Sequence, residues 1–359
     1  MKIKESQCLA KTLKLREPYS IAYESVDKVE NIFINITTID GYNGWGCAAP
    51  VENITNETAQ DVLDSFTNII EPFIKGEDVF RYAYLMEKLK KEIPGKPSAL
   101  AMVDMALHDL MSQKAGVPLY KFLGSYRSSI PTSITIGIMP ISAALAYAKN
   151  HVKMGFTILK IKGGKDVKED IEKINQIRKT VGKQIRIRFD ANQGYTVEDS
   201  MQFIKGTHQA GIELFEQPTP KDQLEQLAQV TAKTSVPVMA DESLLSLKDV
   251  FRLSKGHSTD LINIKLMKTG GILEGMHINS VAKAAGIHAM VGCMDESALG
   301  IVAGLHLALS RPNIKYADLD GHLDIINDPF EGLIKIEKGI LIPPESIGLG
   351  WMGIKPANF

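Results

Sequence analysis

Three acidic residues follow short apolar segments at regular intervals and could together bind a metal ion. They are Asp190, Glu216 and Asp241, each about 25 residues from the next, the length of one strand–helix unit. Carboxylates brought to one point repel one another unless a cation neutralises them. Mg²⁺ prefers oxygen ligands and keeps coordination positions for a substrate. The spacing predicts a Mg²⁺ site, although any one of these residues could instead cap the helix that follows it.

Three lysines lie inside apolar segments, which is unusual for this residue type. Lys160 and Lys162 belong to one segment and Lys265 to another. In an extended strand, Lys160 and Lys162 point to the same side. A lysine whose pKa is lowered by a neighbouring positive charge can act as a general base. The alternative is that these lysines only neutralise the carboxylates. Lys268 either helps to hold a substrate carboxylate or simply begins the next helix.

A parallel (β/α) barrel would bring all of these residues together. From about residue 130, short β-branched apolar segments alternate with longer amphipathic ones, as in α/β barrels. The carboxyl ends of barrel strands meet at one mouth, where active sites lie, and the second and sixth strands lie on opposite sides of it. Lys162 and Lys265 would therefore face each other. The eight predicted strands are 133–139, 157–163, 185–190, 212–217, 236–241, 261–266, 287–292 and 314–320.

The chain on either side of the barrel predicts a second domain. Residues 1–127 are of mixed α+β character, and the end of the chain (323–359) is expected to return to them, which leaves 128–322 for the barrel. Segment 332–344 predicts a hairpin that turns at Lys338-Gly339. In the first region, the sequence predicts a strand at 31–39, a turn at 41–46, and helices over 57–75, 79–92 and 98–115.

The amino-acid composition limits the kinds of binding partner that we expect. The chain has 359 residues, of which 44% are hydrophobic and 23% charged, and its net charge is −1. Such a balance gives no reason to expect nucleic acid or a membrane surface as a partner. The three cysteines form no CxxC pair, and the N-terminus lacks the apolar segment of a signal peptide. We expect a cytoplasmic protein; association into a homo-oligomer stays open.

Taken together, these motifs resemble the enolase superfamily, specifically its mandelate racemase/muconate-lactonising subgroup. The resemblance runs along the whole chain. It implies a modified TIM barrel, (β/α)7β, with an α+β capping domain formed by the N-terminal region and the C-terminal tail. It also implies one Mg²⁺ per subunit, with Lys160 beside the substrate. The matching motifs are KIK (160–162), DANQGYT (190–196), FEQP (215–218), ADES (240–243), NIKLMKTGGI (263–272) and CMDESALGI (293–301).

The eighth strand favours one reaction within this subgroup. Dipeptide epimerases carry an Asp-x-Asp motif there that binds the substrate's α-ammonium group, and Asp318 and Asp320 match it. Thr135 resembles the substrate-contacting threonine of the family. The resemblance implies that Lys162 and Lys265 exchange the α-proton of the dipeptide's C-terminal residue through an enolate, so that the centre is inverted.

One acidic residue departs from the pattern of epimerases that act on Ala-Glu, and a second acid is expected to add to its effect. Glu24, in the loop expected to cover the site, stands where those enzymes carry an arginine for the substrate glutamate, and Asp295 adds a second acid near the mouth. Like charges in a closed site disfavour an anionic substrate. We therefore expect a neutral or cationic second residue in the substrate.

Other readings stay open at this point. An N-acylamino acid racemase, an o-succinylbenzoate synthase or a muconate cycloisomerase would use the same metal and lysines. Their substrates lack an ammonium group, so Asp318 and Asp320 would have no counter-charge. A non-enzymatic barrel would be expected to lack at least one of these residues. The direct roles of Asn192 and Glu242 are not decided by the sequence.

Overall fold

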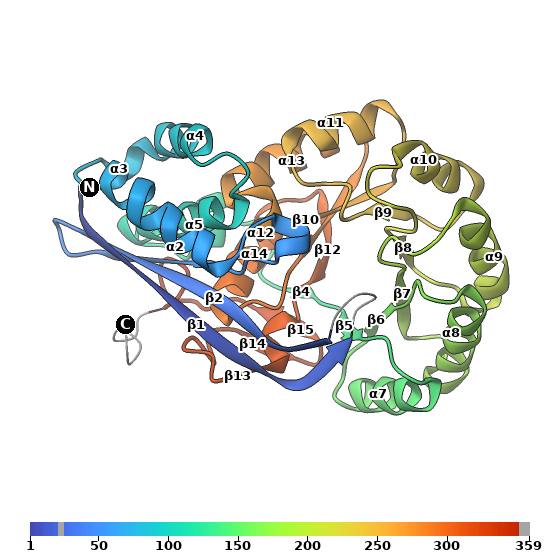
Figure 1. The fold of residues 1–359 in the computed structure, drawn as a ribbon. Coiled ribbons are helices and arrows are strands. Elements are labelled where there is room, and N and C mark those ends of the chain that lie inside the picture. The colour runs from blue at the N-terminus through green and yellow to red at the C-terminus, as the bar shows by residue number, and fades with distance from the viewer. Residues whose placement is uncertain (21–24, 352–359) are drawn as a thin grey trace.

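The computed structural model describes the backbone of residues 1–20 and 25–351 and shows two connected domains (Figure 1). One contains an antiparallel sheet with strand order β13-β1-β2-β3, and the other a parallel sheet with strand order β12-β11-β10-β9-β8-β7-β6-β5. A small third sheet has the order β14-β15-β4. In the described part of the chain, no helix is both long and apolar enough to cross a membrane.

The parallel sheet is the predicted barrel. Each of its strands lies within a segment that the sequence predicts as a strand. A bridge joins Thr132, two residues before β5, to Ala317 of β12, so the sheet is nearly closed. The strands are β5 (Ile134–Ile136), β6 (Ile158–Lys162), β7 (Arg186–Asp190), β8 (Leu214–Glu216), β9 (Val238–Ala240), β10 (Leu261–Lys265), β11 (His288–Gly292) and β12 (Ile314–Asp318).

Helices cover the outside of the barrel and connect successive strands, which confirms the (β/α)7β prediction (Figure 1). The last strand, β12, is followed by a short 3-10 turn, η4 (Gly321–Asp324), instead of an α-helix. The connecting helices are α7 (Ile141–Lys153), α8 (Val167–Val181), α9 (Val197–Thr207), α10 (Leu224–Lys233), α11 (Leu247–Lys255), α12 (Leu266–Thr269), α13 (Ile272–Ala284) and α14 (Ala298–Ser310).

The N-terminal domain packs its three-stranded meander, β1 (Ile3–Ser20), β2 (Ser25–Thr38) and β3 (Asn43–Ala48), against helices. The helical elements are α1 (Glu52–Thr55), α2 (Ala59–Ser65), η1 (Phe66–Ile70), α3 (Glu71–Ile74), η2 (Val79–Arg81), α4 (Tyr82–Glu92), α5 (Pro97–Lys114) and α6 (Leu119–Leu123). β2 overlaps the predicted strand, and α2 to α5 with η1 and η2 occupy the predicted helical segments, but the sequence predicted none of β1, β3, α1 and α6.

The turn predicted at 41–46 is wrong for most of its length, because residues from Asn43 onward form β3. The glycines there serve close packing. A Cβ at Gly44 would lie 2.5 Å from the carbonyl oxygen of Ala106, and one at Gly46 would lie 1.9 Å from that of Met102. Both carbonyls belong to α5, so the two glycines let this helix lie directly on β3.

The C-terminal segment returns to the earlier parts of the chain. β13 (Ile325–Ile326) pairs with β1, which extends the N-terminal sheet. β14 (Lys335–Glu337) and β15 (Ile340–Ile342) form the predicted hairpin, and β15 pairs with β4 (Ile130–Pro131) just before the first barrel strand. The domain boundaries at residues 127 and 322 stay a prediction.

Candidate active site

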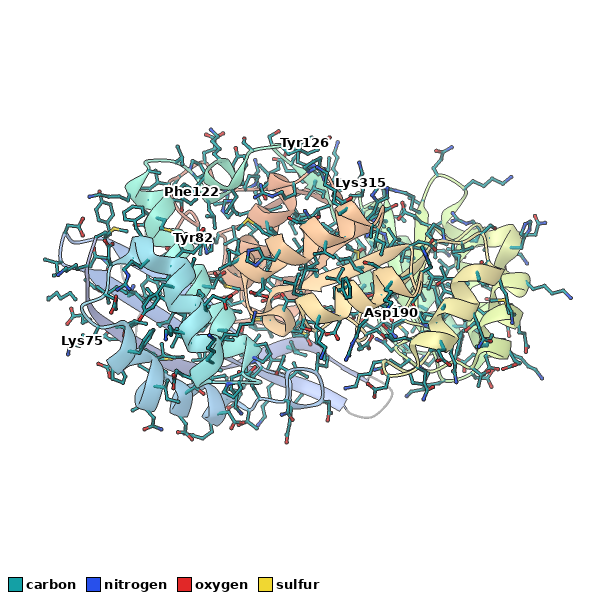
Figure 2. All side chains as sticks on the ribbon, turned by 90° about the horizontal axis from the view of Figure 1, so that it is seen from above. Lys75, Tyr82, Phe122, Tyr126, Asp190 and Lys315 are labelled. Atoms are coloured by element: carbon teal, nitrogen blue, oxygen red, sulfur yellow. The ribbon has the colours of Figure 1, made fainter. Side chains whose placement is uncertain are left out.

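The three predicted metal ligands lie side by side at the carboxyl ends of adjacent strands. Asp190 ends β7, Glu216 ends β8, and Asp241 directly follows β9. Asp190 and Glu216 are paired in register across the two strands. All three side chains are buried. Figure 2 shows Asp190 among the barrel elements, while Lys75 and Tyr82 lie on the N-terminal domain.

Each of these carboxylates has one oxygen held by a fixed donor of the protein. Such partners orient the ligands of a metal site. The three hydrogen bonds are Asn192 N–H to Asp190 Oδ1 at 2.9 Å, Asn263 Nδ2 to Glu216 Oε1 at 2.9 Å, and Lys268 Nζ to Asp241 Oδ1.

The second oxygen of each carboxylate faces a lysine ammonium group. Lys160 Nζ lies 3.1 Å from Asp190 Oδ2 and 2.8 Å from Glu216 Oε2. Lys265 Nζ lies 2.8 Å from Asp241 Oδ2. Burial and the neighbouring Asp190 raise the pKa of Glu216 to about 8. The lysine charges therefore only partly offset burial and the repulsion between the carboxylates.

This donor set fits a hard divalent cation. Three oriented carboxylates each present an oxygen to positive charge, and oxygen is the ligand atom of Mg²⁺. Among the described residues, no group of three or more acidic, histidine or cysteine side chains is arranged so that it could hold a metal ion in this conformation. The ammonium groups of Lys160 and Lys265 contact the carboxylate oxygens that a cation would need, which accounts for the absence of such a group.

The four lysines divide into a buried pair and a more accessible pair. Lys160 and Lys268 are 3% and 1% exposed. The side chain of Lys265 is 12% exposed, and Lys162 is likewise only partly buried. Lys162 ends β6 and Lys265 ends β10, with three strands between them on either side of the barrel. The accessible pair thus lies on opposite sides of the mouth, as predicted.

Burial disfavours the charge on Lys265, but Asp241 outweighs it and raises the pKa of Lys265 above its usual value. In this arrangement Lys265 is therefore protonated. A protonated lysine suits the donation of a proton to one face of a substrate, while the opposite lysine removes one.

Asp318, the last residue of the eighth barrel strand, and Asp320, two residues later, have different hydrogen-bond partners. Asp318 accepts hydrogen bonds from Lys160 Nζ at 2.9 Å and from Ser133 Oγ at 2.6 Å. Burial opposes its charge, but Lys160 outweighs this and lowers the pKa of Asp318 to about 2. Asp320 accepts from the backbone N–H of Thr135 at 2.6 Å, and burial and Asp318 raise its pKa to about 7. A substrate ammonium group would supply the positive charge that Asp320 needs.

The loop after β11 places Asp295 and ties the two domains together. Asn31 of β2 donates from Nδ2 to the carbonyl oxygen of Asp295 at 3.3 Å and accepts from the N–H of Ser297 at 2.8 Å. The position of Asp295 therefore depends on the N-terminal domain. Glu24 lies outside the described residues. Burial and the adjacent Asp241 raise the pKa of Glu242 to about 7, so this carboxyl is also near the site.

Sequence reasoning missed the residues that orient the site. Asn263 and Asn31 are fully buried amides, and each stands in a segment that is otherwise mostly apolar. A lone buried amide requires hydrogen-bond partners, which is the signal that could have indicated them.

Comparisons with known proteins agree with this geometry. The family model "Mandelate racemase / muconate lactonizing enzyme, N-terminal domain" matches residues 4–124, and "Enolase C-terminal domain-like" matches residues 143–352. The chain belongs to the mandelate racemase/muconate lactonizing enzyme family of the enolase superfamily. The sequence-based assignment to this family is thus confirmed.

Relatives that are named for different dipeptide substrates are similar to the chain. An L-Lys-D/L-Arg epimerase of Desulforapulum autotrophicum is 40% identical over 98% of this chain and 99% of the relative. The substrate-liganded L-Ala-D/L-Glu epimerase of Bacillus subtilis superposes with a TM-score of 0.96 at 37% identity. A dipeptide epimerase of Enterococcus faecalis, complexed with Mg and L-Leu-L-Tyr, has a TM-score of 0.95 at 38% identity. Each of these two alignments covers 98% of this chain and 99% of the chain in the solved structure.

Proposed function

We propose that this protein is a Mg²⁺-dependent dipeptide epimerase that inverts the α-carbon of the C-terminal residue of its substrate. The observation that carries the proposal is the arrangement of Lys162 and Lys265 on opposite sides of the barrel mouth, next to three oriented carboxylates. Proton transfer from two opposite faces is what inversion of a carbon centre requires. Relatives along the full length of the chain are named for the same class of reaction.

The residues that would hold Mg²⁺ are Asp190, Glu216 and Asp241. When bound, the ion supplies Lewis-acid charge that stabilises the enolate form of the substrate carboxylate. Lys160 adds a fixed positive charge beside them, since it contacts Asp190, Glu216 and Asp318 at once. This charge favours the developing negative charge of the substrate more than its ground state.

The accessible lysines carry out the proton transfers. One of Lys162 and Lys265 takes the α-proton in its neutral form, and the other, in its protonated form, returns a proton to the opposite face. In the reverse direction their roles exchange. Asp320 and Asp318 bind the α-ammonium end of the dipeptide, and Thr135 fixes Asp320 through its backbone N–H. These contacts hold the α-carbon between the lysines.

We further propose that the substrate has a neutral or cationic second residue. Asn31 donates to the backbone carbonyl oxygen of Asp295 in the loop after β11, and Glu24 belongs to the segment expected to cover the mouth. Two acids here would repel a glutamate side chain and attract a lysine or arginine. An epimerase named for L-Lys-D/L-Arg among the relatives supports a cationic preference. The cytoplasmic location and the oligomeric state stay predictions.

A substrate panel tests the function and its selectivity together. The protein is incubated with Mg²⁺ and equal concentrations of L-Ala-L-Lys, L-Ala-L-Leu, L-Ala-L-Glu and the corresponding N-succinyl amino acids, and epimers are resolved by chromatography. We expect kcat/KM for L-Ala-L-Lys to exceed that for L-Ala-L-Glu by about tenfold or more, the effect of one charge contact. Equal activity on these two would refute the selectivity. Turnover of the N-succinyl compounds alone would make the protein an N-acylamino acid racemase.

A further inference from the structure

The three carboxylates of the proposed metal site are oriented by different kinds of donor. Asp190 is held by a backbone N–H and Glu216 by the amide of Asn263, both of them neutral groups. Asp241 is held by the ammonium group of Lys268, which is charged. This difference distinguishes Lys268 from the other two donors. A positive charge next to a cation ligand weakens cation binding, so we expect Lys268 to contribute something that offsets this cost.

The contacts of Lys268 show what that role is. Its Nζ donates to both the carboxylate Oδ1 and the backbone carbonyl oxygen of Asp241. From the other side, the N–H of Asp241 donates to Gln217 Oε1 at 2.8 Å. Lys268 lies in the short helix α12 and is 1% exposed. It therefore fixes the backbone and the side chain of Asp241 together, from a place that a substrate does not reach.

Lys265 contacts the same carboxylate differently. It approaches Oδ2, the oxygen that Lys268 leaves available, and its side chain is 12% exposed. If Asp241 had Lys265 as its only cationic partner, its orientation would change whenever Lys265 moved to serve the substrate. With Lys268 bound to Oδ1, Oδ2 can stay directed into the site during such a movement.

We propose that Lys268 is a positioning residue that locks Asp241 in one orientation and thereby makes the site selective for Mg²⁺ over larger divalent cations. The proposal rests on the Mg²⁺-dependent function given above. Mg²⁺ demands nearly ideal octahedral geometry at short distances, whereas Ca²⁺ accepts flexible ligands at longer ones. A rigid Asp241 favours Mg²⁺, and a mobile Asp241 would lose that preference.

Comparing two cations separates positioning from simple charge. Replacement of Lys268 by a neutral residue removes one positive charge, which strengthens the attraction for Mg²⁺ and Ca²⁺ alike, so this effect cancels in the ratio of their dissociation constants. The loss of a rigid ligand does not cancel, because it weakens Mg²⁺ binding more than Ca²⁺ binding.

The experiment is isothermal titration calorimetry of the whole protein with MgCl₂ and with CaCl₂, without substrate. In Lys268→Met we expect the ratio Kd(Ca²⁺)/Kd(Mg²⁺) to fall by about tenfold, the lower range for loss of a group that orients a metal ligand. The matched control is Lys173→Met. Lys173 is also 1% exposed and pairs with Asp170 at 3.2 Å, but it lies in α8, and this ion pair involves none of the three carboxylates. This control should keep the wild-type ratio.

A fall of the same size in Lys173→Met, or an unchanged ratio in Lys268→Met, would overturn the proposal; the second result would mean that Lys268 acts only as a counter-charge. Should Lys268→Met not fold, Lys268→Gln, which keeps a hydrogen-bond donor, should show a smaller fall in the ratio, and an unchanged ratio there counts against the proposal equally. The wild-type titration distinguishes the two levels: absence of Mg²⁺ binding by the wild type would refute the proposed function itself.

Discussion

The two ends of the barrel interior are built from the same strands, but one is mostly apolar and the other mostly charged. At the amino end, Leu214, Met239, Leu261 and Met290 form a small buried apolar cluster against Tyr316, beside the buried guanidinium of Arg188, which pairs with Glu213. At the carboxyl end, β8 finishes in Glu216 and β10 in Lys265, inside a network of buried ion pairs. Leu214 and Glu216 are two residues apart on one strand, so both side chains point to the same side.

The two ends differ because one contributes stability and the other holds the groups for chemistry. Apolar burial at the amino end is favourable without any partner. Buried charges at the carboxyl end are tolerated only because each one is paired, and removing one partner leaves the other uncompensated. At the carboxyl end, burial and neighbouring carboxylates raise the pKa values of Glu216, Asp320 and Glu242.

The largest expected effect tests the carboxyl end. Lys162→Ala and Lys265→Ala should each lower kcat for epimerisation by about 10³-fold, since each variant lacks one of the two general acid–base groups. Chiral chromatography of the dipeptide measures this loss. The thermal midpoint of unfolding serves as the control for folding. Retention of epimerisation within tenfold in either variant would contradict the two-lysine arrangement.

The next effect tests the amino end. Leu214→Ala removes a fully buried side chain from the apolar cluster and should lower the free energy of unfolding by about 3 kcal/mol, as measured by urea denaturation. The dissociation constant for Mg²⁺ should stay within about twofold of the wild type, because the substitution alters no charge. If metal binding weakened in parallel with stability, the two ends would not be separable as described.

The smallest expected effect is a pH dependence of stability, and it arises at a residue outside both ends of the barrel. His306 in α14 is buried, its Nδ1 accepts the N–H of Tyr120 at 3.0 Å, and burial lowers its pKa to about 4. The unfolded chain, with a histidine pKa near 6.5, binds the proton more readily. Stability from the neutral ring is therefore present above pH 6.5 and is lost as pH falls towards 4.

Relative to His306→Asn, the wild type should lose about 2 kcal/mol of unfolding free energy between pH 7 and pH 5. Urea denaturation of both proteins at the two pH values measures it. Asparagine can still accept the N–H of Tyr120 but does not titrate, which makes it the matched comparison. Identical pH dependence of the two proteins would show that His306 is not the responsible group.

The sequence predicted the barrel well because strand composition and spacing are local signals. Eight β-branched segments at regular intervals led to eight observed strands, and the charged residues at their ends led to the mouth. The fold and the family are confirmed by the comparisons. The roles of the individual site residues stay proposals.

Local sequence signals are weaker where tertiary contacts decide the structure. β1 is mostly polar, and its long pairing with β2 compensates for that composition. Gly44 and Gly46 suggested a turn, yet they serve the close approach of α5 to β3. Asn263 and Lys268 lie within the segment 263–272 that the sequence singles out, but only the folded chain shows that they orient Glu216 and Asp241.

The most direct test of the central claim is the stereochemistry of hydrogen exchange in D₂O. Lys162→Ala and Lys265→Ala are each incubated with Mg²⁺ and with the L,L and L,D epimers of one dipeptide that the wild type converts, and deuterium at the α-carbon is followed by NMR. We predict that each variant exchanges the α-hydrogen of only one epimer, and that the two variants select opposite epimers. Exchange of both epimers by a single variant would contradict the assignment of one lysine to each face of the substrate.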